Sequence, residues 1–408
     1  MHEWPSTLDA GRLMADGWRP TPFRQFILKI HSRCDLACQY CYMYEMADSS
    51  WRARPRRMPP EVVSATAGRI AEHARAHDLD SIEIILHGGE PLLAGRDGIR
   101  EIVTRVRSAV GGDTRVVASL QTNATLLNDI YLRLFDELGV RVGVSLDGDR
   151  SMHDRGRRRA NGRGSHAAVV AALHRLIAPG FRHLFGGLLC TVDLRNDPIR
   201  AYEALLEFDP PAIDFLLPHG NWTAPPPRRT ADSGLTPYAD WLIEIFDRWY
   251  HTPRQPVRIR LFTEIIHLLL GGSSHSEQVG LSPAAMIVVE TDGDIEQSDL
   301  LKSTYDGASA TGLHVSRDPF DQALLLPPII ARQIGDLALS PQCRACPIAK
   351  VCGGGLYAHR YRAGRGFANP SVYCPDLFRL IRHVKRTLTA DLSARVRARG
   401  STTVHAGS

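Results

Sequence analysis

The sequence predicts an α/β fold: a partial, open (β/α)6 barrel followed by a smaller C-terminal domain. Six apolar runs of strand length occur in the first half of the chain, at residues 24–31, 81–87, 115–122, 140–146, 183–192 and 212–218. Segments with helical spacing lie between them, at residues 60–76, 98–110, 126–138, 165–178 and 198–207. Buried strands that alternate with helices form parallel sheets with right-handed crossovers. Six such units fall short of the eight that close a full barrel, and a doubly wound sheet is the alternative.

Length and composition agree with a large α/β domain plus a smaller unit. The chain has 408 residues, of which 44% are hydrophobic and 23% charged, values typical of globular proteins in solution. It contains no apolar run of about 18 residues, so we expect no membrane span and no membrane partner. Residues 1–20 lack a basic segment followed by an apolar one, so we expect no signal peptide and a cytoplasmic location.

The net charge of +5 is mild, and the basic residues occur in short runs at 51–57, 155–159 and 395–400. These runs are interpreted as solvated surface or as contacts for an acidic peptide. Aromatic residues are not interleaved with them in a nucleic-acid-binding motif, so no nucleic-acid partner is expected.

The remaining pattern suggests how the chain divides. Helices are predicted at 236–250 and 258–270, and residues 285–302 predict a hairpin that turns at Asp292 and Gly293. A basic helical stretch begins at about residue 376. The predicted units are an N-terminal extension, the barrel, a helical bridge, a cysteine-rich domain, and a basic C-terminal helix and tail, at 1–22, 23–230, 231–284, 285–380 and 381–408.

Three cysteines follow the first predicted strand with the spacing C-x3-C-x2-C: Cys34, Cys38 and Cys41. Loops at the carboxyl ends of parallel strands are where such folds place their chemistry. In a reducing compartment, this close spacing favours metal ligation over disulfides. An iron–sulfur cluster bound by three thiolates leaves one iron open to a small molecule. Structural zinc fits less well, because no histidine supplies a convincing fourth ligand.

Polar motifs end the next predicted strands. "HGGEP" spans 87–91, "QTNAT" spans 121–125 and "SLDG" spans 145–148. Glycines allow the backbone to approach a neighbour closely, and a glutamate can accept hydrogen bonds from an ammonium group. Each polar residue alone is more typical of a turn or cap. Their shared position at strand ends raises a ligand-binding interpretation to equal standing.

The cysteine spacing, with Tyr40 before the last cysteine, resembles the signature of the radical S-adenosylmethionine (SAM) enzymes. The resemblance implies a [4Fe–4S] cluster on the three cysteines, whose open iron chelates the amino and carboxylate groups of SAM. Reduction of the cluster, by a donor such as flavodoxin or ferredoxin, then cleaves SAM to a 5′-deoxyadenosyl radical.

The strand-end motifs resemble those of the same superfamily. "HGGEP" resembles its GGEP motif, which implies that Glu90 accepts from the SAM ammonium. "HDRGR" (153–157) resembles H-D-x-x-R, which makes Arg157 the candidate for the SAM carboxylate. The full set of cofactor-binding residues that the resemblance implies is Tyr40, Gly88, Gly89, Glu90, Thr122, Asn123, Ser145, Asp147 and Arg157.

A second cysteine set lies near the C-terminus: Cys343, Cys346, Cys352 and Cys374. Four cysteines complete a closed cluster site, although a zinc knuckle is chemically possible. The spacing resembles the SPASM extension of radical SAM peptide-modifying enzymes, which normally holds two auxiliary [4Fe–4S] clusters.

The chain departs from that pattern at several cysteines. Leu356 stands where a SPASM domain has another cysteine, and Ser298 replaces the cysteine of the hairpin motif while Asp299 is retained. The departures imply that the inner auxiliary cluster is lost and the outer one remains, which gives a truncated SPASM-like domain and two clusters in all. Asp299 is then a free carboxylate near the substrate and the candidate catalytic base, with a strand-end turn role as the alternative. Cys190, in an apolar strand, is expected to be core.

Two longer stretches, "VCGGGLYAHRYRAGRGFANPSVYC" (351–374) and "IEQSDLLKSTYDG" (295–307), resemble the FxsB-type radical SAM/SPASM maturases. The resemblance implies a ribosomally made precursor peptide as substrate and a crosslink between an aromatic ring and the Cβ of a nearby residue, a cyclophane. A hydrogen atom leaves the Cβ, the carbon radical adds to the ring, and a proton and an electron are lost. Asp299 is the candidate proton acceptor and the outer cluster the candidate electron acceptor.

Other readings stay open. A radical SAM enzyme could instead epimerise a residue, form a thioether or make formylglycine. Epimerases need a hydrogen-donating cysteine, and Cys190 is the one spare thiol in the sequence. A non-enzymatic iron–sulfur or zinc scaffold does not account for an open first site beside "GGEP".

Overall fold

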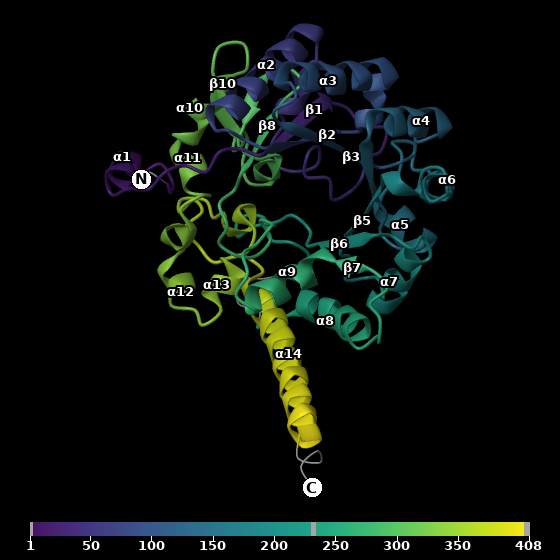
Figure 1. Cartoon of the computed structure of the whole chain (residues 1–408), viewed down its shortest axis with the longest axis vertical. Helices are drawn as coiled ribbons and strands as arrows, with labels where there is room; N and C mark the ends of the chain where they lie inside the picture. The colour runs from purple at the N-terminus through teal and green to yellow at the C-terminus, as the bar shows by residue number, and fades with distance from the viewer. Residues whose placement is uncertain (1–2, 230–233, 404–408) are drawn as a thin grey trace.

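The structure is a computed structural model that describes residues 3–229 and 234–403, with side chains described up to residue 395. The predicted basic run at 395–400 therefore lies almost wholly outside the described side chains. The described residues form one sheet of ten strands in the order β10-β9-β8-β1-β2-β3-β4-β5-β6-β7, which curves through the body of the molecule (Figure 1).

The predicted parallel sheet is confirmed. Its six strands pair in chain order and run parallel: β1 Gln25–His31, β2 Ser81–Gly88, β3 Arg115–Thr122, β4 Val140–Ser145, β5 Phe185–Thr191 and β6 Ala212–Leu216. Sequential order without a reversal is the arrangement of a partial barrel, whereas a doubly wound sheet changes direction at a switch point. Five helices fall on the predicted segments: α2 Pro60–Ala76, α3 Gly95–Val110, α4 Asp129–Leu138, α6 His166–Leu176 and α7 Pro198–Leu206.

The sheet extends further at both edges than the sequence indicated. A short strand, β7 Arg258–Ile259, pairs with β6, and β8 Met286–Val289 pairs in parallel with β1. The predicted hairpin is confirmed, because β8 and β9 Asp294–Glu296 are antiparallel across Asp292 and Gly293, and Gly293 has a φ of +97°. β10 Ala310–His314 then pairs with β9. The hairpin is thus joined to the barrel sheet.

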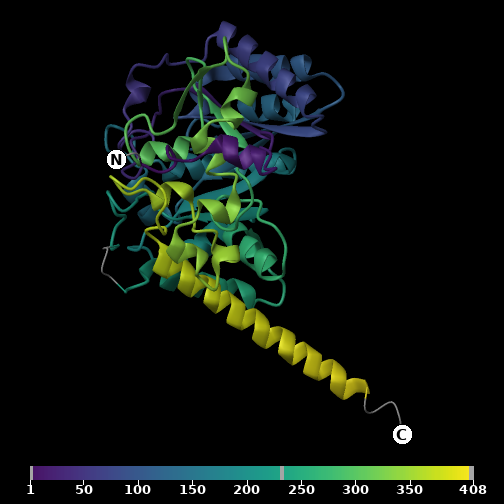
Figure 2. The same cartoon turned by 90° about the vertical axis from the view of Figure 1, so that its left-hand side faces the viewer.

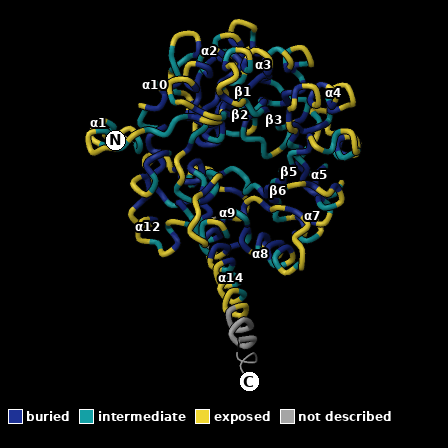
Figure 3. Tube along the Cα trace, in the orientation of Figure 1, coloured by how far each residue is buried: buried dark blue, intermediate teal, exposed yellow. Residues whose placement is uncertain are grey.

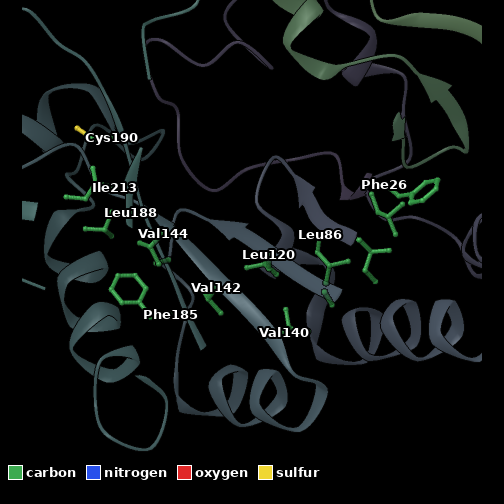
Figure 4. Close-up of a cluster of buried hydrophobic side chains, with 14 of the residues drawn as sticks. Phe26, Leu86, Leu120, Val140, Val142, Val144, Phe185, Leu188, Cys190 and Ile213 are labelled. Atoms are coloured by element: carbon green, nitrogen blue, oxygen red, sulfur yellow. The ribbon is translucent and has the colours of Figure 1, made fainter. Parts of the chain in front are cut away.

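The core lies between the strands and their helices (Figures 3 and 4). Along β2, buried side chains alternate with partly buried ones. Ile84 and Leu86 are fully buried on the helix side, as are Leu120 and Val142 on the next strands. Cys190 is 2% exposed and belongs to this hydrophobic cluster, as expected. The alternation gives every strand a second face toward the barrel interior, where the polar side chains collect.

The C-terminal half adds helices around one end of the sheet. The predicted pair is present as α8 Pro237–Tyr250 and α9 Arg260–Leu269, and both pack against α14 Cys374–Thr403. The first part of α14 is buried there, and the rest projects away from the body (Figures 1 and 2). The shorter helices are α1 Ala10–Ala15, α5 Arg150–Gly156, α10 Phe320–Leu324, α11 Pro327–Ile330, α12 Pro341–Arg344 and α13 Ala349–Cys352. Within the described ranges, no helix is long and apolar enough to cross a membrane.

Candidate active site

The three cysteines of the first set lie in the loop that follows β1. All eight cysteines of the chain are described, and all are free thiols. Burial raises the pKa of Cys38 to about 11 and also raises the pKa of Cys34 and Cys41, while the nearby Arg157 lowers that of Cys38 and Cys41. Because desolvation opposes a negative sulfur, thiolates in this loop require a positive partner. A metal cluster is such a partner.

Two glycines let β2 approach this loop. Gly88 has a φ of +145°, and a Cβ on it would lie 2.2 Å from the carbonyl oxygen of His31. A Cβ on Gly89 would lie 1.9 Å from the hydroxyl of Tyr44 and 2.5 Å from the backbone of Arg33. The close approach expected of "HGGEP" is therefore made to the cysteine loop itself. It fixes the loop against the end of the strand.

Glu90 sits at the centre of the strand ends, with no exposed surface. Its carboxylate accepts from the hydroxyl of Thr122 at 2.6 Å and from the backbone N–H groups of Asn123 and Leu92 at 2.8 and 3.1 Å. Burial raises the pKa of Glu90 to about 7, against the opposing effect of these hydrogen bonds. A carboxylate has about four acceptor positions, so three internal partners leave one for a further donor.

The loop of Asn123 is tied to the cysteine loop through a residue that the sequence analysis missed. The amide of Asn123 donates to Asp35 Oδ1 at 2.8 Å and lies 3.6 Å from Cys34 Sγ. Thr125 and Arg159 also contact the Asp35 carboxylate. An acidic residue directly after the first cysteine was the available signal. Asp35 positions one cysteine relative to the end of β3.

The end of β4 approaches the loop from the other side. Tyr40 donates to the carboxylate of Asp147, which also accepts from the backbone N–H of Thr191 at 3.0 Å. The guanidinium of Arg157 lies 5.9 Å over the Tyr40 ring, and its Nη1 lies 4.0 Å from Cys38 Sγ. Arg157 Nε lies 3.7 Å from Asp147 Oδ2 as an ion pair, but within the described part of the chain it is buried without a hydrogen-bond partner. Ser145 is held separately, by a 3.0 Å hydrogen bond from Gln121.

These donors and acceptors fit a [4Fe–4S] cluster with SAM. Three free thiols face a buried guanidinium that has an unsatisfied N–H, and a buried carboxylate nearby has one vacant acceptor position. A molecule with one ammonium and one carboxylate group would satisfy both.

Asp299 lies in the barrel interior, 4% exposed, and forms an ion pair with Lys29 of β1. Its carboxylate also accepts from Tyr42 OH at 2.8 Å. Burial opposes the charge, but Lys29 and these hydrogen bonds hold the pKa of Asp299 well below its usual range. Lys29 Nζ also donates to His87 Nδ1 at 2.8 Å. Burial and the positive charge of Lys29 together lower the pKa of His87 to about 4.

The partners of Asp299 were not identified from the sequence. In the sequence, Lys29 is the one charged residue inside the apolar run "FILKI". His87 begins the motif "HGGEP", and no separate role was predicted for it. Their positions on neighbouring strands place both side chains on the interior face. The alternation of side chains between the two faces of each strand was therefore the available signal in the sequence.

The second cysteine set gathers at α12, α13 and the start of α14. Burial, together with the negative charge of Cys343, raises the pKa of Cys352 to about 12 and that of Cys374 to about 11. The turn after Cys352 requires glycine, since a Cβ on Gly353 would lie 1.7 Å from the carbonyl oxygen of Gly280. Arg360 donates to the carbonyl groups of Gly353 and Gly355 at 2.5 and 2.7 Å, which fixes this turn. Cys343 and Cys346 lie near enough to Cys374 for their charges to raise its pKa.

Residues 28–207 match the model of the radical SAM superfamily. The chain is 27% identical over 278 residues to a cysteine-type anaerobic sulfatase-maturating enzyme of Clostridium novyi (strain NT), covering 66% of this chain and 71% of that one. It is 26% identical over 366 residues to a serine-type enzyme of Klebsiella aerogenes, covering 86% and 84%.

Solved structures share the fold. The structure of the sulfatase-maturating enzyme anSMEcpe with bound AdoMet has a TM-score of 0.76 at 21% identity, and the match covers 91% of this chain and 98% of that one. Streptococcus suis SuiB bound to precursor peptide SuiA has a TM-score of 0.56 at 12% identity, with 89% and 78% covered. The partial barrel with its C-terminal domain is therefore a known arrangement.

Proposed function

We propose that this chain, whose residues 28–207 match the model of the radical SAM superfamily, is a SAM-dependent enzyme that oxidises a side-chain carbon of a peptide substrate. The observation that carries the proposal is the convergence of three free thiols, the buried carboxylate of Glu90 and the buried guanidinium of Arg157 at the end of one sheet. A scaffold protein would have no use for this vacant binding geometry.

Each residue in this group has a distinct task. Cys34, Cys38 and Cys41 hold the cluster, and Glu90 and Arg157 bind the amino and carboxylate ends of SAM. Asp147, which accepts a hydrogen bond from Tyr40, forms an ion pair with Arg157. Glu90 is held by hydrogen bonds from Thr122 and Asn123. Once bound, SAM on its cluster supplies the 5′-deoxyadenosyl radical that removes a hydrogen atom from the substrate. Cys343, Cys346, Cys352 and Cys374 hold an auxiliary cluster.

Asp299 accepts the proton that the oxidised substrate releases. Its low pKa makes it a weak base, so it serves only a substrate that is strongly acidic at that moment. A ring radical that regains aromaticity on losing its proton is acidic in this sense. The Lys29 ammonium, which contacts both Asp299 and His87, connects the accepted proton to a neutral imidazole.

For the product, we propose a crosslink between an aromatic ring and the Cβ of a neighbouring residue in a ribosomally made precursor peptide. The support is the resemblance of residues 295–307 and 351–374 to the cyclophane-forming maturases. The substrate loses two hydrogens in all: one as an atom from Cβ, and one from the ring as a proton accompanied by an electron.

The sulfatase-maturating relatives favour formylglycine formation as a second candidate. It requires the same first step at Cβ and the same removal of a proton and an electron. A serine converted in this way also loses two hydrogens, so the intact mass does not distinguish it from a crosslink. A cysteine would lose two hydrogens to give a thioaldehyde, which water would hydrolyse to the aldehyde with release of hydrogen sulfide.

The test is an anaerobic reaction of the reconstituted enzyme with SAM, a reductant and two peptides. One is a candidate precursor peptide that contains aromatic residues, and the other is a sulfatase peptide with its target serine or cysteine. Tandem mass spectrometry reports a crosslink as missing fragment ions between the joined residues, whereas a hydrazine probe traps the aldehyde of formylglycine. If SAM is not cleaved to 5′-deoxyadenosine with either peptide, the proposed function is wrong.

A further inference from the structure

Four aromatic rings form a column between the two cysteine sets. Tyr42 contacts His219 at a centroid distance of 4.8 Å, His219 contacts His359 at 5.7 Å, and His359 contacts Tyr373 at 4.9 Å. The rings come from the cysteine loop, the segment after β6, the turn before residue 361 and the residue that precedes α14. Nothing in the proposed hydrogen abstraction uses His219, His359 or Tyr373.

The ends of the column are covalently next to the two sets. Tyr42 directly follows Cys41, and Tyr373 directly precedes Cys374. The column therefore begins at a residue bonded to one proposed cluster ligand and ends at a residue bonded to another. No similar aromatic series among the described ring contacts joins the two sets.

The terminal rings are held by hydrogen bonds to fixed groups. Tyr42 OH donates to Asp299 at 2.8 Å, and Tyr373 OH donates to the carbonyl of Pro218 at 2.6 Å, one residue before His219. The backbone carbonyl of His359 accepts from Val372 N–H at 2.9 Å. These contacts bring the segment after β6 and the turn around residue 359 to the start of α14.

The two middle rings are neutral imidazoles. Burial lowers the pKa of His219 to about 4 and lowers that of His359 well below its usual value. Each has one buried ring nitrogen, Nδ1 of His219 and Nε2 of His359, with no hydrogen-bond partner in the described ranges. A buried unpartnered nitrogen is unfavourable by about 1–3 kcal/mol, so packing alone would be served better by phenylalanine or leucine. No hydrogen bond to these two atoms explains their presence.

We propose that this column carries the electron from the oxidised peptide to the cluster held by Cys343, Cys346, Cys352 and Cys374. The inference rests on the proposed function and assigns residues to its electron-removing step. The peptide is oxidised by one electron and the auxiliary [4Fe–4S] cluster is reduced by one, while no bond in the column forms or breaks. The rate of electron transfer falls steeply as the distance across non-bonded gaps grows. Each conjugated ring in the column divides the distance into shorter gaps between neighbouring rings.

Tyr42 separates the two products of the oxidation. Its hydroxyl contacts Asp299, which takes the proton, and its ring contacts His219, where the electron path begins. Proton and electron thus leave the substrate from one point in different directions. The arrangement also explains how a chain without the inner cluster ligands could connect its peptide site to the outer cluster.

The experiment compares His359→Leu with His359→Phe in the fully reconstituted enzyme. Leucine removes the conjugated ring, whereas phenylalanine keeps a ring and removes an unpartnered nitrogen, so it should fold at least as well. After a single turnover with peptide, freeze-quench electron paramagnetic resonance follows the reduced auxiliary cluster. We expect the leucine variant to form 5′-deoxyadenosine at the wild-type rate while the reduced-cluster signal appears about tenfold or more later. The phenylalanine variant should behave as wild type.

Iron content and the equilibrium reduction potential of the auxiliary cluster serve as controls, together with His174→Leu, which removes an exposed histidine beside Phe208 outside the column. A leucine variant with a loaded cluster and a wild-type signal rate overturns the relay. If His359→Leu loses iron, His219→Leu, farther from the four cysteines, decides the question by the same criterion. If the wild-type enzyme neither cleaves SAM nor changes the peptide, the proposed function has failed rather than the relay.

Discussion

At the scale of single residues, the site depends on charges that are buried and individually paired. Asp299 and Lys29 are both almost fully buried, and Glu90 has no exposed surface. Removing one partner of a buried pair leaves the other uncompensated, which is more costly than losing an exposed ion pair. Substitutions here must therefore be judged by cofactor binding and by product formation separately.

Asp299→Asn should separate hydrogen abstraction from product formation. The amide keeps the shape of the side chain but cannot accept the substrate proton, so product formation should fall by about 10²- to 10⁴-fold, the usual contribution of a general base. Formation of 5′-deoxyadenosine should continue, because it precedes the lost step. Liquid chromatography of both products from one reaction measures the ratio.

Asp299→Asn also leaves the Lys29 ammonium buried without its carboxylate, so thermal unfolding of the variant is the necessary control. His87→Gln, which keeps an acceptor for Lys29, is the matched variant beside it. A normal rate of product from a folded Asp299→Asn enzyme would assign the proton to water or to another group.

Glu90→Gln should weaken SAM binding and remove its dependence on pH. Burial raises the pKa of Glu90 to about 7, so the carboxylate is largely protonated below that pH in the absence of SAM. The N–H groups of the SAM amino group prefer the charged form of Glu90, so affinity should rise as pH increases toward 7 and then level off. Glutamine should cost about 1.5–3 kcal/mol of binding at pH 8 and give a flat profile. Equilibrium dialysis with labelled SAM between pH 6 and 8 measures both.

The stability of the folded protein depends on pH in the opposite direction to the SAM affinity. The folded pKa of Glu90 lies above the unfolded value, so the folded apoprotein binds more protons than the unfolded chain between about pH 4.5 and 7. Its contribution to stability is complete below that window and is lost as pH rises through it. A SAM affinity that is equal in wild type and Glu90→Gln at every pH would limit Glu90 to a structural role between β2 and β3.

At the scale of elements, the sequence predicted well what is local. All six barrel strands and the five longer helices between them follow from apolar periodicity, whereas the short α5 was not predicted. The Asp292-Gly293 turn was equally local. The parallel pairing of β8 with β1 was not predictable, since it joins segments about 260 residues apart and leaves no periodic signal in either one.

The same distinction holds for the site. The cysteines and strand-end motifs were visible as short patterns. The Lys29–Asp299 pair and the column from Tyr42 to Tyr373 were not, because they depend on which segments the fold brings together.

Gly89→Ala tests the packing of β2 on the cysteine loop. Its Cβ would overlap the Tyr44 hydroxyl and, less avoidably, the backbone of Arg33, so the loop must move. We expect loss of iron from the first cysteine set, with the auxiliary cluster retained. Iron content and Mössbauer spectra of the reconstituted protein measure this.

Gly68→Ala is the matched control on α2, where a Cβ would meet nothing within 4 Å. An alanine in the middle of a helix should stabilise the protein by about 0.5–1 kcal/mol and leave both iron sites intact. Full iron content and SAM cleavage in Gly89→Ala would show that the loop tolerates displacement and that its close approach to β2 is unnecessary.

At the scale of the whole molecule, two sites lie in one fold whose sheet runs through the barrel and into the C-terminal hairpin (Figure 1). The N-terminal segment also contacts the C-terminal part of the chain, because Trp4 packs against the hydrophobic cluster that contains Tyr357 and Phe367. The domain boundaries and the FxsB-type assignment remain predictions. Asp299 contacts Tyr42, the residue after Cys41, so in the proposed reaction a peptide that reaches Asp299 lies near the first cysteine set.

The number of iron atoms bound per chain tests the proposed arrangement of two clusters. Three cysteines in one set and four in the other should hold two [4Fe–4S] clusters, about eight irons per chain. Replacing Cys34, Cys38 and Cys41 by alanine should leave about four irons and abolish SAM cleavage, because the remaining set has no open iron. Replacing Cys343 and Cys346 should preserve SAM cleavage and remove the auxiliary signal. About twelve irons in a fully occupied wild-type protein would mean that ligands other than these cysteines complete a third, inner cluster.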